Sequence, residues 1–186
     1  MDTFEDKKGT GALRPMREAD LELVRAWRNA PEVASKMYTR HHISASEHKA
    51  WWVRTRDSEE QQYFLYEKDD VPLGVVSVTQ IDKVNANCFW AFYASPSAPR
   101  GTGSRMEFLA LEHVFGRLGL HKLSCEVLAF NKPVIRLHRK FGFQEEGVFR
   151  AHHKMDDDYV DIVRLGLLAW EWAGKREEFA TMFNKT

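Results

Sequence analysis

Two hydrophobic periods alternate along this chain of 186 residues. Short stretches rich in Val, Ile, Phe and Tyr, bounded by Gly, Pro, Asn or Asp, are typical of strands. They cover residues 12–16, 61–67, 71–81, 86–94, 121–130, 147–154 and 159–168. The turns around residues 68–72 and 155–158 each separate two of these stretches, which predicts a hairpin at each place.

Apolar residues at a helical spacing predict helices between these strands. The expected helices cover residues 21–29, 48–56, 104–117 and 134–141. Asp20 is the expected N-cap of the first, and Ser44 with Glu47 forms a capping box before the second. Gly142 suits the position that follows the last. Helices that interrupt a mixed sheet predict an α/β or α+β fold, with a mixed central sheet flanked by helices.

The length predicts a single domain, because 186 residues can bury a sizeable core. We expect a flexible N-terminal tail over residues 1–11, one domain over 12–172 and a C-terminal tail over 173–186. The first residues are too polar for a signal peptide, and the apolar runs are too short to cross a bilayer. We therefore expect a cytoplasmic monomer or homodimer that does not bind a membrane.

The charge balance is even, with 27 Lys and Arg against 27 Asp and Glu. A chain without a broad positive excess is not expected to bind nucleic acid. Cys88 and Cys125 form no Cys-x-x-Cys pair, and the eight histidines are scattered. We therefore predict buried free thiols and no metal site.

The glycine-rich stretch PRGTGS at residues 99–104 precedes the helix expected from residue 104. Two glycines one residue apart allow positive φ angles and a close approach of a ligand to the main chain. A helix N-terminus after such a turn can bind an anion through its free N–H groups. An ordinary tight turn explains the same residues. The sequence has neither a Walker A motif nor a dinucleotide fingerprint.

Two motifs in a fixed order resemble a known family. Residues 98–103, Ala-Pro-Arg-Gly-Thr-Gly, match the [QR]xxGx[GA] motif except that Ala98 stands where Gln or Arg is usual. The run EVLAFNKPVIRLHRKFGFQEEG at residues 126–147 matches a later signature. Over residues 12 to 170 the chain resembles the GNAT N-acetyltransferase superfamily. The resemblance implies the GNAT acyl-CoA N-acyltransferase fold and acetyl-CoA as co-substrate, without a metal.

The resemblance also implies where the co-substrate binds. Its pyrophosphate would lie in the glycine loop, and its pantetheine arm between two strands that splay apart. The residues implied in binding it are Ala94, Arg100, Gly101, Thr102, Gly103, Ser104 and Asn131. For Asn131, a turn or a helix N-cap is the alternative role.

Acetyl transfer needs a neutral amine, and a positioned base accelerates it by about 10²–10⁴-fold. By the resemblance, Glu126 is the candidate base; a solvent-facing strand residue is the alternative. The backbone N–H near Tyr93 is the candidate oxyanion donor. His138 stands where many members have a tyrosine that protonates the leaving thiolate. It can act as that acid, hydrogen-bond the sulfur or only fill space.

The first half of the chain resembles one group within this family, the PseH-type enzymes, in the phrases WRN-PEV, MYT and EH-WW. That group acetylates the 4-amino group of a UDP-linked 4-amino-4,6-dideoxy sugar in pseudaminic acid biosynthesis. The resemblance implies a nucleotide-sugar substrate. The residues expected to bind it are Arg28, Met37, Tyr38, His48, Thr79 and Gln80.

Two other functions fit the sequence less well. An acetyltransferase for a peptide N-terminus or a small amine such as a polyamine would share the same motifs. A polyamine site should have an acidic rim, whereas residues 35–44 are neutral to basic. A non-catalytic domain that senses acyl-CoA would not need Glu126.

Overall fold

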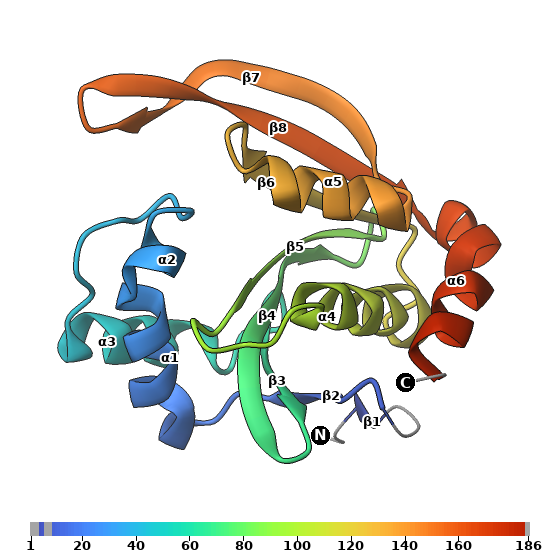
Figure 1. The fold of residues 1–186 in the computed structure, drawn as a ribbon, viewed down its shortest axis with the longest axis horizontal. Helices are drawn as coiled ribbons and strands as arrows, with labels where there is room; N and C mark the ends of the chain where they lie inside the picture. Colours follow the sequence, from blue (N-terminus) through green and yellow to red (C-terminus); the bar gives the residue numbers. More distant parts are fainter. Residues whose placement is uncertain (1–3, 6–8, 185–186) are drawn as a thin grey trace.

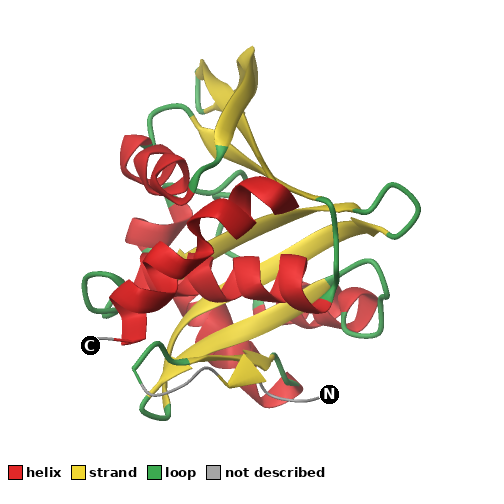
Figure 2. Ribbon diagram, turned by 90° about the vertical axis from the view of Figure 1, so that its right-hand side faces the viewer, coloured by secondary structure: helices red, strands yellow, loops and turns green. Residues whose placement is uncertain are grey.

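The computed structural model describes residues 4–5 and 9–184. Eight strands in the described residues form one mixed sheet in the order β1-β2-β3-β4-β5-β6-β8-β7. Their bounds are β1 Phe4–Glu5, β2 Ala12–Pro15, β3 Gln62–Lys68, β4 Val71–Asp82, β5 Asn87–Ala94, β6 Lys122–Leu128, β7 Gln144–Met155 and β8 Asp158–Leu168. All neighbours are antiparallel except β5 and β6. Figures 1 and 2 show the sheet with helices on both of its faces.

Helices cover both faces because β3 and β4 alternate their apolar side chains. The helical segments are η1 Glu18–Asp20, α1 Leu21–Asn29, α2 Pro31–Ala34, α3 Ala45–Thr55, α4 Thr102–Leu111, η2 Glu112–Arg117, α5 Lys132–Phe141 and α6 Ala169–Asn184. Val76 and Val78 face the main core with α4 and α6. Leu65 and Val75 face a second cluster with α1 and α3. The predicted mixed sheet with flanking helices is therefore confirmed.

Most local predictions are also confirmed. Asp69 and Asp70 both have positive φ angles in the turn between β3 and β4. The hydroxyl of Ser44 accepts a hydrogen bond from the backbone N–H of Glu47 at the start of α3, which is one half of the predicted capping box. The carboxylate of Glu47 binds His41 instead of supplying the other half. Gly142 follows α5 with a φ angle of 106°. Cys88 and Cys125 are buried free thiols.

Two predictions about the chain ends differ from the structure. Residues 173–184, expected as a tail, form most of α6, and Phe179 and Phe183 from this segment lie in the main core. Phe4–Glu5, within the expected N-terminal tail, pair with Ala12 and Leu13 of β2. The other residues of the two expected tails that the structure leaves out, 1–3, 6–8 and 185–186, lie outside the described residues.

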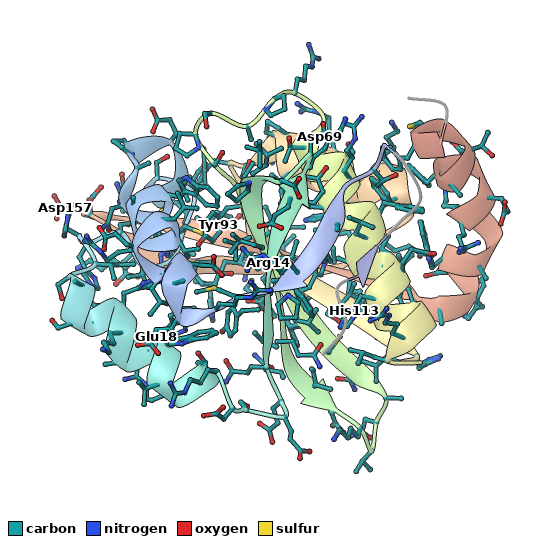
Figure 3. All side chains as sticks on the ribbon, turned by 90° about the horizontal axis from the view of Figure 1, so that it is seen from below. Arg14, Glu18, Asp69, Tyr93, His113 and Asp157 are labelled. Carbon is teal, nitrogen blue, oxygen red and sulfur yellow. The ribbon has the colours of Figure 1, made fainter. Side chains whose placement is uncertain are left out.

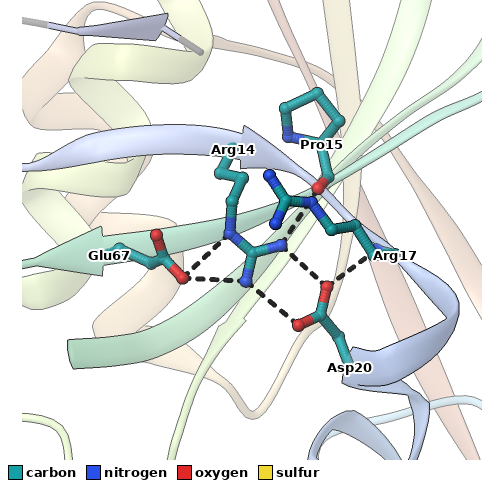
Figure 4. Close-up of polar contacts among 5 residues, drawn as sticks. All are labelled: Arg14, Pro15, Arg17, Asp20 and Glu67. Atoms are coloured by element: carbon teal, nitrogen blue, oxygen red, sulfur yellow. Dashed lines mark hydrogen bonds and ion pairs between the residues drawn. The ribbon is translucent and has the colours of Figure 1, made fainter. Parts of the chain in front are cut away.

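Asp20 does not cap α1 through its side chain. Its carboxylate instead accepts the backbone N–H of Arg17 at 2.7 Å and two hydrogen bonds from Arg14, at 2.8 and 3.0 Å. Arg14 also binds Glu67 on β3 at 2.8 Å. Figure 4 shows how this network joins β2 and β3 to the turn before α1. Arg14 and Glu67 are 53 residues apart in the chain, so the pattern of neighbouring residues does not predict that they pair.

The helix expected over residues 104–117 begins at Thr102 and changes to a π-helix at Glu112. Met106, Leu109, Ala110 and Val114 are all buried, as their spacing predicts. The helix follows the segment that leaves β5, and α5 follows β6. The glycine loop and the later motif therefore come from the ends of the two parallel strands.

Candidate active site

β5 and β6 pair as parallel strands over only three residues. The pairs are Asn87 with Lys122, Cys88 with Leu123 and Phe89 with Ser124. Beyond Phe89, alternate N–H and C=O groups of β5 point away from β4 without β6 as a partner. The strands therefore splay apart, as the resemblance implies for a pantetheine site.

A cavity of about 380 Å³ fills this splay, and we call it the cleft cavity. It is lined by residues 90–94 of β5, residues 125–128 of β6, Asn131, Val134 and His138, and by Glu32, Val33, Lys36, Met37 and Tyr38. Seven of the predicted site residues thus line one cavity: Met37, Tyr38, Tyr93, Ala94, Glu126, Asn131 and His138. Sequence-distant segments meet here because both parallel strands end at the same edge of the sheet.

A second cavity of about 380 Å³ lies between the sheet and helices α1 and α3, and we call it the helix cavity. It shares Met37, Ala91, Phe92 and Tyr93 with the cleft cavity. Figure 3 places Tyr93 on the side of the sheet that α1 covers. Two substrates that enter from the two cavities can meet at this shared wall.

The glycine loop has the conformation that its sequence requires. Gly101 precedes α4 with a φ angle of 94°, which favours glycine. The N–H and hydroxyl groups of Thr102 both bond to the carbonyl of Pro99. The amides of Gly103 and Ser104 lie in the first helical turn, where N–H groups lack intrahelical partners. These residues fit an anionic group such as a pyrophosphate.

Gly103 also has a packing role. A Cβ atom at this position would lie 3.3 Å from the ring of Phe92 and 3.4 Å from Leu137. The absence of a side chain therefore lets α4 approach both β5 and α5. Arg100 is exposed at the start of the loop. Anion binding and close packing are both compatible with this turn.

Glu126 lies on the wall of the cleft cavity and is held from two sides. Its Oε1 accepts a hydrogen bond of 3.1 Å from Arg164, its neighbour on β8, and its Oε2 accepts one of 3.2 Å from the hydroxyl of Tyr38. The guanidinium carbon of Arg164 also lies 4.1 Å from the ring centroid of Phe89, the last residue of β5 that pairs with β6. The carboxylate is therefore positioned at the point where the strands part.

His138 is buried at the back of the cleft cavity. Its Nδ1 lies 2.9 Å from Oε1 of Glu107 on α4. Burial opposes a charge on His138, but the carboxylate of Glu107, together with Cys125, raises its pKa to about 10. The rings of Trp90 and Phe92 pack against the imidazole edge-on. The imidazole therefore fills the space between these rings and lies within hydrogen-bond distance of Glu107.

The loop between α2 and α3 forms the roof of both cavities. Asn29 binds the backbone N–H and C=O of Ile43 at 2.8 and 2.9 Å, and Arg28 donates to the carbonyl of Thr39 at 3.2 Å. Arg40 pairs with Asp156 at the tip of the β7–β8 hairpin. These contacts hold the loop that carries Met37 and Tyr38, which line the cleft cavity. In Figure 1 the segment between α2 and α3 lies below the long β7–β8 hairpin.

Three predicted acceptor residues meet in the helix cavity. Arg28, Met37 and His48 all line it. Burial lowers the pKa of Arg28, and it also lowers the pKa of His48, with Arg25 nearby adding to the effect. Tyr38 lines the cleft cavity instead, and burial followed by the charge of Glu126 raises its pKa.

Thr79 and Gln80 do not belong to this group, which corrects the prediction. Gln80 is exposed, has a φ angle of 51° at an irregularity of β4, and lies beside Glu59 and Asp82 near the β4–β5 turn. Thr79 pairs with Phe89 and lines neither cavity. Ser77, two residues earlier, lines the helix cavity. The sequence indicates that Thr79 and Gln80 lie near the end of a strand, but it does not indicate which end of that strand faces the site.

The sequence interpretation missed Glu107, Arg164 and Trp51. A signal existed for each charged residue, because Glu107 interrupts an apolar helix face and Arg164 an apolar strand run. Trp51 lines the helix cavity, where its ring stacks on His48 at 5.0 Å and meets Tyr63 edge-on at 4.9 Å, centroid to centroid.

Within residues 4–5 and 9–184, no cluster of three or more His, Cys, Asp or Glu residues is arranged to hold a metal ion. None of the described helices has the length and apolar character needed to traverse a membrane.

Comparison with known proteins gives this site a family. The profile of the acetyltransferase (GNAT) domain matches residues 12–144, which include the glycine loop, Glu126 and His138. The chain belongs to the GNAT acetyltransferase family. This GNAT protein is an N-acetyltransferase that uses acetyl-CoA as co-substrate, and the splayed strands and glycine loop fit that molecule.

Individual relatives of this GNAT chain fall into different groups. It is 24% identical over 128 residues to the acetyltransferase PseH of Campylobacter jejuni, covering 69% of this chain and 79% of that protein. It is 23% identical over 166 residues to the spermidine N(1)-acetyltransferase of Escherichia coli, covering 89% of each. A Vibrio cholerae spermidine N-acetyltransferase, solved with CoA and spermine, superposes with a TM-score of 0.82 at 21% identity, covering 87% of this chain and 96% of that one. Similarity therefore establishes the family and fold and leaves the acceptor open.

Proposed function

We propose that this acetyltransferase modifies the 4-amino group of a UDP-linked 4-amino-4,6-dideoxy sugar, as in pseudaminic acid biosynthesis. The observation that carries the proposal is the character of the helix cavity, which is cationic and aromatic. Arg28, Arg54 and His48 line it together with Trp51 and Tyr63. A nucleotide sugar offers a flat base for the aromatic rings and a diphosphate for the cations.

Arg28 is the strongest individual support. Its guanidinium donates to the carbonyl of Thr39, while its Nη1 has no hydrogen-bond partner within the described residues and is buried. A buried N–H group without a partner is costly, so a ligand acceptor at this place would stabilise the site. An anionic oxygen is the acceptor that a guanidinium binds best.

The same charges oppose a polyamine in the helix cavity. Glu47 is the carboxylate among the described residues that line it, and it already binds His41 at 2.8 Å. A polycation placed beside Arg28 and Arg54 would be repelled. A polyamine would instead be attracted by Glu32 and Glu126 in the cleft cavity. Arg164 partly neutralises the charge of Glu126 there.

In this proposal the chain's residues position and deprotonate the amine. Bound acetyl-CoA supplies an activated thioester carbonyl. Glu126, held by Tyr38 and Arg164, accepts the proton that the amine loses. Binding of the remote nucleotide by the helix cavity orients the amine toward the shared wall at Tyr93. The N–H groups around Tyr93 and Ala94 donate to the developing oxyanion.

The test compares acceptors under one thiol-release assay. UDP-4-amino sugars should have a higher kcat/KM than spermidine or peptides that begin with Ala or Ser. Arg28→Met should raise KM for the UDP-sugar by about tenfold, the effect of about one charge-assisted hydrogen bond. Arg56→Met, at the end of α3 outside both cavities, is the matched control. A clearly higher kcat/KM for a peptide or polyamine would overturn the nucleotide-sugar assignment.

A further inference from the structure

A carboxylate and an imidazole form a buried pair behind the cleft cavity. Their side chains, Glu107 on α4 and His138 on α5, are 0% and 3% exposed. Oε1 of Glu107 lies 2.9 Å from Nδ1 of His138. The pair joins the two helices that follow the two splayed strands.

The surroundings fix the orientation of the imidazole. The rings of Trp90, Phe92 and Phe143 lie 5.4, 5.9 and 5.2 Å from it, centroid to centroid. Because Nδ1 faces Glu107, Nε2 is the nitrogen that remains for the cleft cavity, which His138 lines. Cys125 on β6, which also lines this cavity, is a second hydrogen-bond partner of the imidazole, so a leaving thiolate at Nε2–H would lie beside its thiol.

Stability alone gives little reason for this pair. Taking two charges out of water costs several kcal/mol for each ion, and apolar residues of similar size often serve a core equally well. The second carboxylate oxygen of Glu107 has no hydrogen-bond partner within the described residues, which adds to the cost. A costly pair at the edge of a reaction cavity is a candidate for function.

We propose that Glu107 is a positioning residue that keeps His138 as a fixed cation, whose Nε2–H stabilises the thiolate that leaves acetyl-CoA. The inference rests on the acetyltransferase activity and on the predicted role of His138, and it is independent of which amine is the acceptor. In the reaction the amine nitrogen bonds to the acetyl carbon, the C–S bond breaks, and its electron pair leaves on sulfur. The proton lost by the amine passes to Glu126.

The protonation of His138 decides how it acts. Burial alone would lower its pKa, but Glu107 and Cys125 raise it to about 10. Burial raises the pKa of Glu107, while the nearby His138 opposes that rise. An ordinary thiol has a pKa of about 8.5. The contact of 2.9 Å with Glu107 favours the charged form of His138, so in this proposal His138 acts as a hydrogen-bonding cation that keeps its proton as the thiolate leaves.

Two titratable groups face His138: Glu107 from α4 and Cys125 from β6. Its other neighbours, Trp90 and Phe92 from β5 and Phe143 after α5, are aromatic.

Glu107→Gln keeps the shape of the side chain and an acceptor for the Nδ1–H group of His138 but removes the charge. In the wild type the cation should persist well above neutral pH, because the carboxylate of Glu107 raises the pKa of His138. In Glu107→Gln it should be lost at a clearly lower pH, because burial then opposes the charge with only Cys125 left to favour it.

Nitrogen NMR of the full chain labelled in histidine measures this directly, without any acceptor. The expected spectrum shows His138 protonated on both nitrogens at pH 8 in the wild type and on one in Glu107→Gln. Turnover of the variant should fall on the order of tenfold or more, with a loss that grows as the pH rises and an unchanged KM for acetyl-CoA.

Glu112→Gln is the matched control, because this carboxylate binds Arg176 and Trp172 away from the cavity. It should leave the His138 spectrum unchanged. Glu107→Asp retains the negative charge, so His138 should still be protonated on both nitrogens. The same spectrum of this variant tests the proposal if Glu107→Gln does not fold. A neutral His138 at pH 8 in the wild type, or the same titration in Glu107→Gln, would overturn the proposal. Because the spectra need no acceptor, that failure is distinct from a wrong nucleotide-sugar assignment.

Discussion

The hydroxyl of Tyr38 donates a hydrogen bond of 3.2 Å to Oε2 of Glu126, although 88 residues separate the two in the chain. The loop before α3 thus contacts the strand that carries the candidate base. On its other side, the ring of Tyr38 lies 4.9 Å from the ring of His153 on the β7–β8 hairpin. One tyrosine therefore links the roof of the cleft cavity, the candidate base and the hairpin.

Tyr38→Phe should lower turnover by about three- to tenfold, because a hydrogen bond to a charged group contributes about 1.5–3 kcal/mol and its loss is partly replaced by water. Burial and the charge of Glu126 raise the pKa of Tyr38, so the hydroxyl keeps its proton at neutral pH and acts as the donor. Acetyl-CoA affinity should not change. Steady-state kinetics would check this, with Tyr159→Phe, on the exposed part of β8, as the control. Equal turnover in both variants would remove Tyr38 from the mechanism.

Glu126→Gln should lower turnover by about 10²-fold or more and change the acid limb of the pH–rate profile, since the base is lost. Isothermal calorimetry should show nearly unchanged binding of acetyl-CoA. Glu146→Gln is a matched control, because Glu146 also lies near Arg164, at 3.9 Å, and binds Lys122 without lining the cleft cavity. If both variants retain activity and pH profile, Glu126 is only a cross-strand partner of Arg164.

Gly103→Asp should weaken acetyl-CoA binding by tenfold or more, about 1.4 kcal/mol, because a carboxylate would repel a phosphate group at the start of α4. Gly103→Ala is the control: it introduces the same close Cβ contacts with Phe92 and Leu137 without a charge. Calorimetry should therefore separate the two variants. Similar losses in both would indicate that packing, and not anion binding, explains this glycine.

The sequence predicted those features that depend on neighbouring residues. The hairpin at Asp69 and Asp70, the Ser44 cap and the left-handed Gly142 each follow from a few adjacent side chains. The family motifs located Glu126, His138 and Asn131 on one cavity, because both motifs follow parallel strands that end at the same edge.

Features that depend on distant partners could not be predicted in this way. Gln80 follows Thr79 on an apparently regular strand, and only the irregular pairing with β5 shows where its side chain lies. The helix that contains Phe179 has a polar sequence around a few core residues, so it resembled a tail. The carboxylate of Glu107 becomes informative only beside His138, 31 residues later.

Arg14 forms ion pairs with Asp20, directly before α1, and with Glu67 on β3, and these pairs should stabilise the fold. Burial opposes the charge of Asp20, but hydrogen bonds from Arg14 and Arg17 lower its pKa. A lowered pKa in the folded state means that this stabilisation is present above the unfolded value, about 3.9, and is lost as the pH falls through the folded value. Asp20→Asn should therefore cost about 1–3 kcal/mol at pH 7, and the cost should fall as the pH is lowered below about 3.9. Urea unfolding of the wild type and of Asp20→Asn at pH 7 and pH 3 would check this.

Asp57→Asn is the control, because Asp57 is an exposed ion-pair partner of Arg56. It should change the free energy of unfolding by less than about 1 kcal/mol. A cost for Asp20→Asn that is the same at both pH values would show that the ion pair with Arg14 does not stabilise the fold.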